Sequence, residues 1–278
     1  MDFGSIACDG FSVISKNEIP LITDDRFTKA GIEHGFTTRH GGVSEGNFSS
    51  LNLAYSDERS DSLQNVEKNH SMLLEAFDVL PQNAVQTRQL HTDNVVACDN
   101  LGGTGYCMPE FSCGVDGVVT CTRGQLLLAR MADCLPILMY DSGTGAVAAI
   151  HSGWKGTIQS IGAKSADMLC HIHNGRKSDI LVSFGPSIGQ CCYEVGEEFR
   201  RNFINAFGNE VSHAFSLCGK SLYADMREIN RIILIRCGIP DKNISVYTPC
   251  TCCNENHFFS YRRQKSQRGT LAAVIKCK

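Results

Sequence analysis

Two neighbouring stretches, MADCLPILMYD (Met131–Asp141) and AAIHSGWKG (Ala148–Gly156), decide the fold class. Each contains an apolar run of the length of a buried strand. The Gly-Thr-Gly segment at 143–145 lies between them and indicates a tight turn, and therefore a β-hairpin. Cys134 stands just before the first run and His151 ends the second. Because ligand sites form where strands of a rigid sheet end, we expect both side chains at a functional site.

The remaining elements follow from the same pattern of apolar residues. Short apolar runs separated by Gly, Asp and Ser predict further strands, at residues 94–98, 116–121, 125–131, 179–185, 243–247, 257–261 and 270–276. Helical spacing of apolar residues predicts helices at 60–80, 157–172, 196–207 and 224–238. Strands and helices are interspersed without strict βαβ alternation. We therefore predict an α/β (α+β) fold, with a mixed sheet or two sheets and outer helices, in a single domain over 1–278.

The helix predicted at 60–80 carries the clearest amphipathic pattern. Its expected buried face is formed by Leu63, Val66, His70, Leu73, Leu74 and Phe77. Asp61 and Gln64 have the spacing of a capping box, and Pro81 follows the end of the pattern.

Composition excludes several classes of protein. The 278 residues are 42% hydrophobic and 20% charged, with a net charge of −3, as in a globular protein. We expect no nucleic-acid partner, because no Lys/Arg cluster makes a nucleic-acid footprint and the basic run YRRQKSQR at 261–268 is expected to be a solvated loop. We expect no membrane span, because no apolar run reaches about 18 residues. Fifteen cysteines without a signal peptide indicate reduced thiols and a cytoplasmic location. The pattern does not decide between a monomer and a homodimer.

Three metal-capable side chains stand at the ends of predicted strands: His91, Cys134 and His151. His91 ends a further strand-like run, AVQTRQLH at 84–91. Two imidazoles and one thiolate would leave a fourth position open, which is the pattern of a catalytic zinc, Zn²⁺. The same set with an axial methionine, such as Met131, also suits blue copper. Their separations of 43 and 17 residues match no local motif, so spacing alone leaves separate core or surface roles open.

The sequence resembles the bacterial YfiH family, also called the laccase-domain family. The resemblance rests on these motifs: TTRHGGVSEGNFSSLNL (37–53), QLHTDNVV (89–96), DGVVT (116–120), ADCLPILMYD (132–141), AAIHSGWKGT (148–157), FGPSIGQCCYEVGEEF (184–199), CTCC (250–253) and HFFSYRRQKSQRG (257–269). They extend from about residue 31 to the end of the chain, in the order of the family.

The resemblance implies a β-sandwich flanked by helices, in about four layers, and one zinc ion held by His91, Cys134 and His151. It also implies purine nucleoside chemistry: phosphorolysis of adenosine, inosine, guanosine and methylthioadenosine, and deamination of adenosine. Purine nucleosides and phosphate are therefore the expected partners. Some family members are linked to the removal of wrongly built peptidoglycan precursors.

Three further residues are candidates for the chemistry. Arg39, in a glycine-rich turn, is our first candidate for binding phosphate, against the alternative that it stabilises its loop by bonding carbonyl groups. Lys155 is the second; it stands where the family most often has arginine, so it offers a point charge and no bidentate fork. Asp133, beside Cys134, either carries a proton or holds the end of the strand.

Cysteines outside the triple are expected to have structural roles. We expect Cys191 and Cys192 to form a tight turn without a disulfide. The CTCC segment is similar to a fragment of a zinc ribbon, but no second pair follows at a matching spacing, so we expect no structural zinc there. His171 and His173 alone fall far short of a multicopper ligand set.

Three classes of function therefore remain in competition. The first is a zinc-dependent purine nucleoside phosphorylase and adenosine deaminase, which we favour. The second is a copper-dependent polyphenol oxidoreductase. The third is a cysteine hydrolase, with Cys134 as the nucleophile and a histidine as the base.

Overall fold

The computed structural model describes residues 2–54, 61–99, 101 and 111–278. The helices are α1 (Asp25–Lys29), α2 (Leu63–Ala76), α3 (Trp154–Ile158), α4 (Ile161–His173), α5 (Glu197–Phe207), α6 (Met226–Arg236) and α7 (Tyr261–Gln264). The strands are β1 (Phe11–Lys16), β2 (Ile19–Asp24), β3 (His34–Thr37), β4 (Ala84–Gln86), β5 (Val95–Ala97), β6 (Gly117–Thr120), β7 (Leu126–Met131), β8 (Leu135–Asp141), β9 (Val147–Ser152), β10 (Ile180–Phe184), β11 (Glu194–Val195), β12 (Phe215–Cys218), β13 (Ser221–Ala224), β14 (Ile244–Val246) and β15 (Leu271–Lys276).

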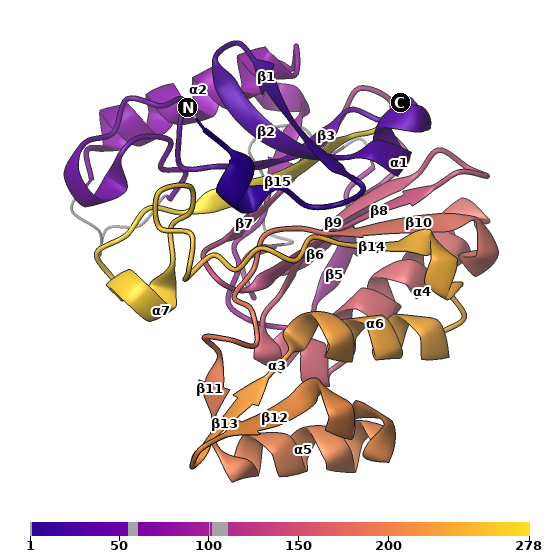
Figure 1. The fold of residues 1–278 in the computed structure, drawn as a ribbon. Coiled ribbons are helices and arrows are strands. Elements are labelled where there is room, and N and C mark those ends of the chain that lie inside the picture. Colours follow the sequence, from indigo (N-terminus) through magenta and orange to yellow (C-terminus); the bar gives the residue numbers. More distant parts are fainter. Residues whose placement is uncertain (1, 55–60, 100, 102–110) are drawn as a thin grey trace.

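Two six-stranded sheets form the centre of the protein (Figure 1). The first has the order β1-β2-β3-β15-β7-β4, and the second has the order β14-β10-β8-β9-β6-β5. Both sheets are mixed: β4 runs parallel to β7, β10 to β14 and β5 to β6, whereas the other neighbouring pairs are antiparallel. A small sheet, β11-β13-β12, lies with α5 at the end of the protein opposite α2 and the first sheet (Figure 1). The predicted mixed fold is thereby confirmed.

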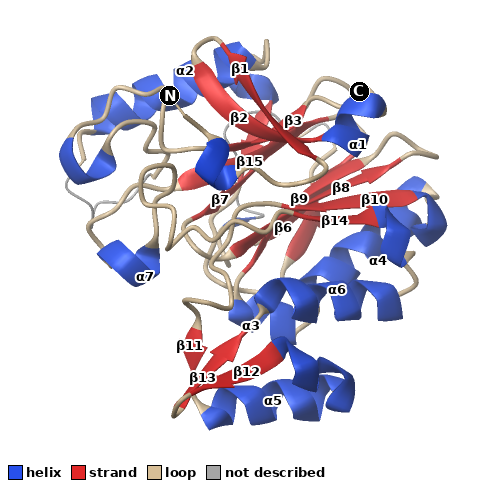
Figure 2. Cartoon of the chain, in the orientation of Figure 1, coloured by secondary structure: helices blue, strands red, loops and turns tan. Residues whose placement is uncertain are grey.

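The layers follow from where the apolar side chains are buried. The two large sheets share one core, in which Phe36 and Leu127 of the first meet Leu138 and Ala149 of the second. Helix α2 packs on the outer face of the first sheet, and α4 with α6 covers the outer face of the second (Figure 2). The order of layers is helix, sheet, sheet, helix, as expected from the resemblance. The prediction of a single domain stays a prediction.

The hairpin that the sequence predicted places two of the candidate ligands side by side. Strands β8 and β9 pair antiparallel, with Leu135 opposite Ser152 and Pro136 opposite His151. The turn between them includes Gly145 at a φ of 81°, a left-handed conformation that glycine adopts without strain. Cys134 directly precedes β8, so the register brings its side chain next to that of His151.

The helix predicted at 60–80 differs at its start. Helix α2 is capped by Ser62, whose hydroxyl accepts from the N–H of Asn65 at 3.5 Å, so the capping box at Asp61 is wrong. The Asp61 carboxylate instead accepts hydrogen bonds from Ser44 and Asn52. Leu63 is exposed, whereas the other five predicted members of the apolar face are buried. Ser60, at the predicted start, lies outside the described residues.

Other elements also differ from the prediction. The helix expected at 157–172 is two helices, α3 and α4, because Ser160 between them adopts a left-handed φ of 61°. The strand expected at 257–261 is wrong: Phe258 and Phe259 are buried, but backbone N–H groups there turn back to the Asn254 carbonyl. Strands β1 to β3 and the small sheet were not predicted.

Among the described residues, no helix combines the length and the apolar composition that are needed to span a lipid bilayer.

The shared core between the sheets yields a first prediction. The Phe36 ring is fully buried and lies so close to the end of β10 that a Cβ on Gly185 would stand 2.2 Å from it. Phe36→Ala should therefore lower the free energy of unfolding by about 3–5 kcal/mol in urea titrations. Leu217→Ala is the control, because this exposed leucine should cost no more than about 0.5 kcal/mol. Equal costs for both variants would contradict the packing described.

Candidate metal centre and substrate cavity

The three predicted ligands converge in the structure. Cys134 Sγ lies 3.8 Å from His91 Nε2, and the rings of His91 and His151 are 4.8 Å apart between centroids, at 87°. One ligand atom from each residue lies within 4.8 Å of the others. Two imidazole nitrogens and one thiolate at these separations suit a single zinc ion with its fourth position open, so the donor set fits the expected metal.

The three ligands come from different kinds of element. Cys134 precedes β8 and His151 lies in β9, as the strand-end argument predicts. His91 lies in the loop after β4 and not at the end of a strand, and it adopts a positive φ of 59°. A backbone conformation that side chains rarely adopt needs a surrounding structure that holds it.

Asp116 holds both histidines. Its Oδ1 lies 2.7 Å from His151 Nδ1, and this contact leaves Nε2 of the ring to face the other ligands. The same carboxylate accepts backbone N–H groups from Leu90, His91 and Thr92, at 2.8 to 3.2 Å, and so fixes the loop that carries His91. Asp116 is not among the predicted site residues, although it is the acid that opens the DGVVT motif.

Gly153 leaves the space in which the ligands meet. A Cβ at this position would stand 2.9 Å from Cδ2 of His91, and 3.5 Å from both the Cys134 sulfur and Cε1 of His151. Since real Cβ contacts of 2.9 Å are essentially never found, any other residue would displace His91.

The thiol of Cys134 and the imidazole of His151 shift each other's pKa strongly. Burial raises the pKa of Cys134, but the charge of His151 and hydrogen bonds from both histidines outweigh burial and lower the pKa from 9.0 to about 6. Burial lowers the pKa of His151, but the Cys134 thiolate and Asp116 raise it to about 10. Without metal, the pair is therefore a thiolate beside an imidazolium at neutral pH.

The triad lies in a cavity of about 1460 Å³. Its wall includes aromatic side chains and several arginines: Trp154, Tyr193, Tyr261, Arg88, Arg130, Arg262 and Arg268. Trp154 is 40% exposed and packs its ring against Phe199 at 5.8 Å, so it belongs to the cavity wall and not to the core. Flat rings and guanidinium groups around one cavity suit a ligand that has both an aromatic base and an anionic group.

Arg268 has the most unusual surroundings of these arginines. Its guanidinium lies over the Tyr261 ring, 5.0 Å from the centroid. The Nε atom is buried and has no hydrogen-bond partner within the described parts of the chain. Burial lowers the pKa of Arg268, and the charges of Asp133 and Cys134 oppose that shift. A buried donor without a partner costs free energy, and an anion bound at this wall of the cavity can satisfy it.

The Asp133 carboxylate is used as a structural acceptor. Its oxygens accept hydrogen bonds from the Thr251 hydroxyl at 2.6 Å, the Ser260 hydroxyl at 2.9 Å and the Arg262 N–H at 2.6 Å. Of the two roles left open for this residue, these contacts favour the one in which it holds the strand end. It ties the residue before Cys134 to two distant parts of the chain.

Arg39 and Lys155 lie apart from the triad. Arg39 lines a different cavity, of about 430 Å³, and donates to the carbonyls of Ser49 at 2.7 Å and Glu255 at 2.9 Å. These contacts are those of the loop-stabilising alternative. Lys155 is exposed on α3, with Nζ 5.7 Å from the centroid of the Trp154 ring. Neither is among the described residues that line the large cavity.

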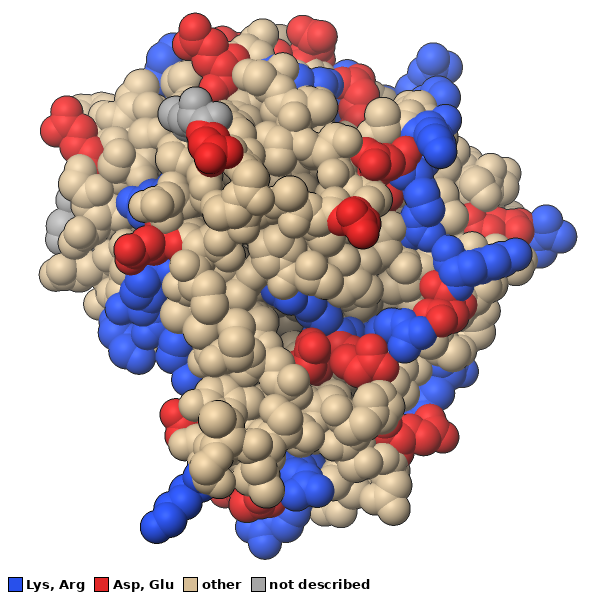
Figure 3. Space-filling view, viewed as in Figure 1, with Lys and Arg blue, Asp and Glu red and all other residues tan. Residues whose placement is uncertain are grey.

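The surface charge shows no single-signed field on the visible face. Figure 3 shows Lys and Arg side chains interspersed with Asp and Glu over this side of the protein. A continuous basic stripe, which a nucleic-acid interface needs, is not visible there. Arg262 and Arg268 of the basic run near the C-terminus line the cavity, so this run is not simply a solvated loop.

The ion pair yields a second prediction. In zinc-free protein, alkylation of Cys134 by iodoacetamide should be half-maximal near pH 6, because its lowered pKa keeps the thiolate present above that pH and loses it below. Peptide mapping by mass spectrometry separates Cys134 from the other cysteines. His151→Ala should move the midpoint towards 9. A midpoint near 9 in the unsubstituted protein would show that the pair does not form.

The chain is similar to known proteins over most of its length. A purine nucleoside phosphorylase from Bacteroides thetaiotaomicron is 32% identical over 94% of this chain and 97% of its own length. The adenosine deaminase RL5, from an unknown prokaryotic organism, is 33% identical over 84% and 89%. The crystal structure of a hypothetical protein YfiH from Bacillus licheniformis superposes with a TM-score of 0.87 and 28% identity, over 98% of this chain and 100% of that one. Residues 33–278 match the family described as multi-copper polyphenol oxidoreductase laccase, and the chain therefore belongs to this YfiH-like family.

Proposed function

We propose that this protein is a zinc-dependent purine nucleoside phosphorylase that also deaminates adenosine. The observation that carries the proposal is the position of His91, Cys134 and His151 in one cavity with aromatic rings and with Arg268, whose buried Nε has no hydrogen-bond partner among the described residues. Relatives named purine nucleoside phosphorylase and adenosine deaminase support it.

The residues around the metal position have separable tasks. His91, Cys134 and His151 would hold the zinc, and Asp116 would keep His151 aimed at it. When bound with an open fourth position, zinc supplies a water whose pKa is lowered towards 7. Asp133 acts as a positioning residue that fixes the segment before Cys134.

The cavity wall would bind the two halves of the substrate pair. The exposed face of Trp154 and the ring of Tyr193 offer surfaces on which a purine can stack. Arg268 offers its unpartnered Nε–H to phosphate, and Arg262 adds positive charge from the same wall. Phosphate and nucleoside would thereby be held close together in one cavity, and this proximity is what phosphorolysis requires.

A cysteine hydrolase is a second candidate, because one observation favours it. Asp116, His151 and Cys134 form an acid, base and thiol series, with a thiolate at neutral pH. In that case His91 would have no ligand role. A copper oxidoreductase would require stoichiometric copper with a strong blue absorption, which metal analysis of protein purified without added copper detects.

His91→Ala separates the zinc enzyme from the hydrolase. Loss of one of three ligands should abolish conversion of adenosine to adenine with phosphate and to inosine without it, as followed by chromatography. Chelation should abolish the same reactions in unsubstituted protein, and added zinc should restore them. His70→Ala is the control, since this buried histidine lies outside the cavity. Full turnover by folded His91→Ala would remove zinc from the mechanism.

Arg268→Gln tests the phosphate site. Because a hydrogen bond to a charged group contributes about 1.5–3 kcal/mol, the KM for phosphate should rise about 10- to 100-fold, with little change in deamination of adenosine. Arg39→Gln tests the assignment made from the sequence, and its contacts to carbonyl groups predict an unchanged KM for phosphate. The opposite pattern would return the phosphate site to Arg39.

A further inference from the structure

Two loops that are distant in sequence meet at one end of the second sheet. Strands β10 and β14 are parallel neighbours, so the chain leaves both at the same edge. The loops stay together beyond the strands: Ser187 forms a bridge with Cys250, and the N–H of Thr251 donates to the Ser187 carbonyl at 3.0 Å. Each loop carries a pair of cysteines, Cys191 with Cys192 and Cys250 with Cys253.

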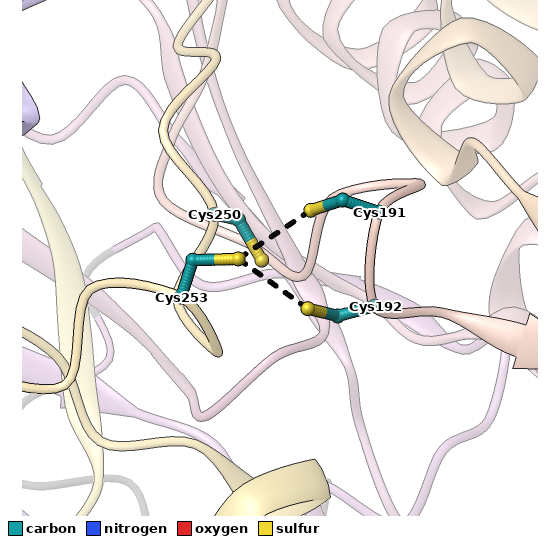
Figure 4. Close-up of side chains that lie close together, drawn as sticks. All are labelled: Cys191, Cys192, Cys250 and Cys253. Carbon is teal, nitrogen blue, oxygen red and sulfur yellow. Dashed lines mark hydrogen bonds between the residues drawn. The ribbon is translucent and has the colours of Figure 1, made fainter.

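The four cysteines point towards one another (Figure 4). The Cys253 sulfur lies 3.6 Å from that of Cys191 and 3.4 Å from that of Cys192, and all four sulfurs lie within 4.8 Å of one another. The sequence predicts no metal at the CTCC segment, because no second cysteine pair follows it. The second pair precedes it in the sequence, and the parallel strands bring it into place.

We propose that Cys191, Cys192, Cys250 and Cys253 form a second metal site that holds one structural zinc ion. Zinc–sulfur bonds of about 2.3 Å place the sulfurs of a tetrahedral site roughly 3.8 Å apart, close to the separations found here. Cys250 and Cys253 have the C-x₂-C spacing of many structural zinc sites. Four thiolates close the coordination shell, so this ion has no open position for chemistry.

The backbone around the cluster suits a bound thiolate. The N–H of Gly189 donates to the Cys250 sulfur at 3.1 Å, and the Cys250 carbonyl is fixed by Asn254 through both its backbone and its side chain. A Cβ at Gly189 would lie 3.2 Å from the Cys191 sulfur and from Cβ of Cys250, so a glycine lets the two loops approach. Such outer contacts orient metal ligands in other proteins.

A buried cation lies beside the cluster. Arg227 is 7% exposed, and among the described residues its hydrogen bonds go to uncharged oxygens of Ser187, Thr248 and Pro249. A buried guanidinium needs negative charge nearby. Asp225 supplies part of it, and the sulfurs of Cys250 and Cys191 would add negative charge near Arg227 when they are ionised. A zinc ion with four thiolates carries two negative charges and would complete the balance.

The site would brace the wall of the large cavity. Ile188 and Tyr193, on either side of the first cysteine pair, line that cavity. Thr251, between the other two cysteines, donates to Asp133, the neighbour of Cys134. The proposed ion therefore joins the two loops on which the position of Cys134 and one cavity wall depend, without touching the reacting groups.

Metal content of the purified protein tests the proposal without any substrate. Plasma mass spectrometry should find about two zinc ions per chain in unsubstituted protein, one in Cys253→Ser and one in Cys134→Ala. Cys252→Ser is the matched control: it alters the same segment but a residue outside the cluster, and it should retain two. Unchanged zinc in Cys253→Ser, or no zinc in Cys134→Ala, would overturn the proposal, as would iron in place of zinc.

A second measurement covers the case in which Cys253→Ser does not fold. Cys134→Ala refolded with Co²⁺ should show the sulfur-to-cobalt charge-transfer bands and intense d–d bands of a tetrahedral thiolate site; their absence would overturn the proposal. Unreduced, denatured protein treated with chelator should titrate with all fifteen thiols. Fewer thiols, with the missing pair assigned to the cluster by peptide mapping, would show that the cluster forms a disulfide instead. Neither readout depends on the proposed nucleoside chemistry, so the two proposals fail separately.

Discussion

The candidate centre depends on one carboxylate, that of Asp116. It contacts Nδ1 of His151 at 2.7 Å and also accepts the backbone N–H groups of the loop that carries His91. The loop has no strand geometry of its own at this point, and His91 adopts a left-handed conformation. A single buried anion thereby positions two ligands from different elements, and it raises the basicity of one of them.

Asp133 performs the corresponding task on the other side of Cys134. Its side chain accepts from Thr251, Ser260 and Arg262, so one residue just before β8 fixes both the cysteine-containing loop and the start of α7. The cavity wall built from these segments includes Arg262 and Arg268. Residues that appear catalytic from their sequence position can therefore act by orienting the segments that carry the reacting groups.

Sequence reasoning predicted the features that depend on local pattern. The apolar runs of β7 to β10, their hairpin and the helices α5 and α6 are confirmed, because burial on a sheet or a helix face leaves a periodic signature. Strands β1 to β3 were missed, and the run at 257–261 is not a strand although its phenylalanines are buried. Burial and regular backbone structure are separate properties, and an apolar run reports only the first.

The site shows the same division between local and long-range information. Positions at the ends of predicted strands indicated the three candidate ligands, but only the family resemblance joined them into one zinc site, since separations of 43 and 17 residues carry no rule. Asp116 and Arg268 gained their roles only from three-dimensional proximity. The cysteine pairs show the reason most directly: they are about 60 residues apart, and only the parallel pairing of β10 with β14 brings them together. A search along the chain for ligand pairs assumes that ligands that are close in space follow one another in the sequence. This assumption fails in a mixed sheet, because crossover connections bring distant segments together.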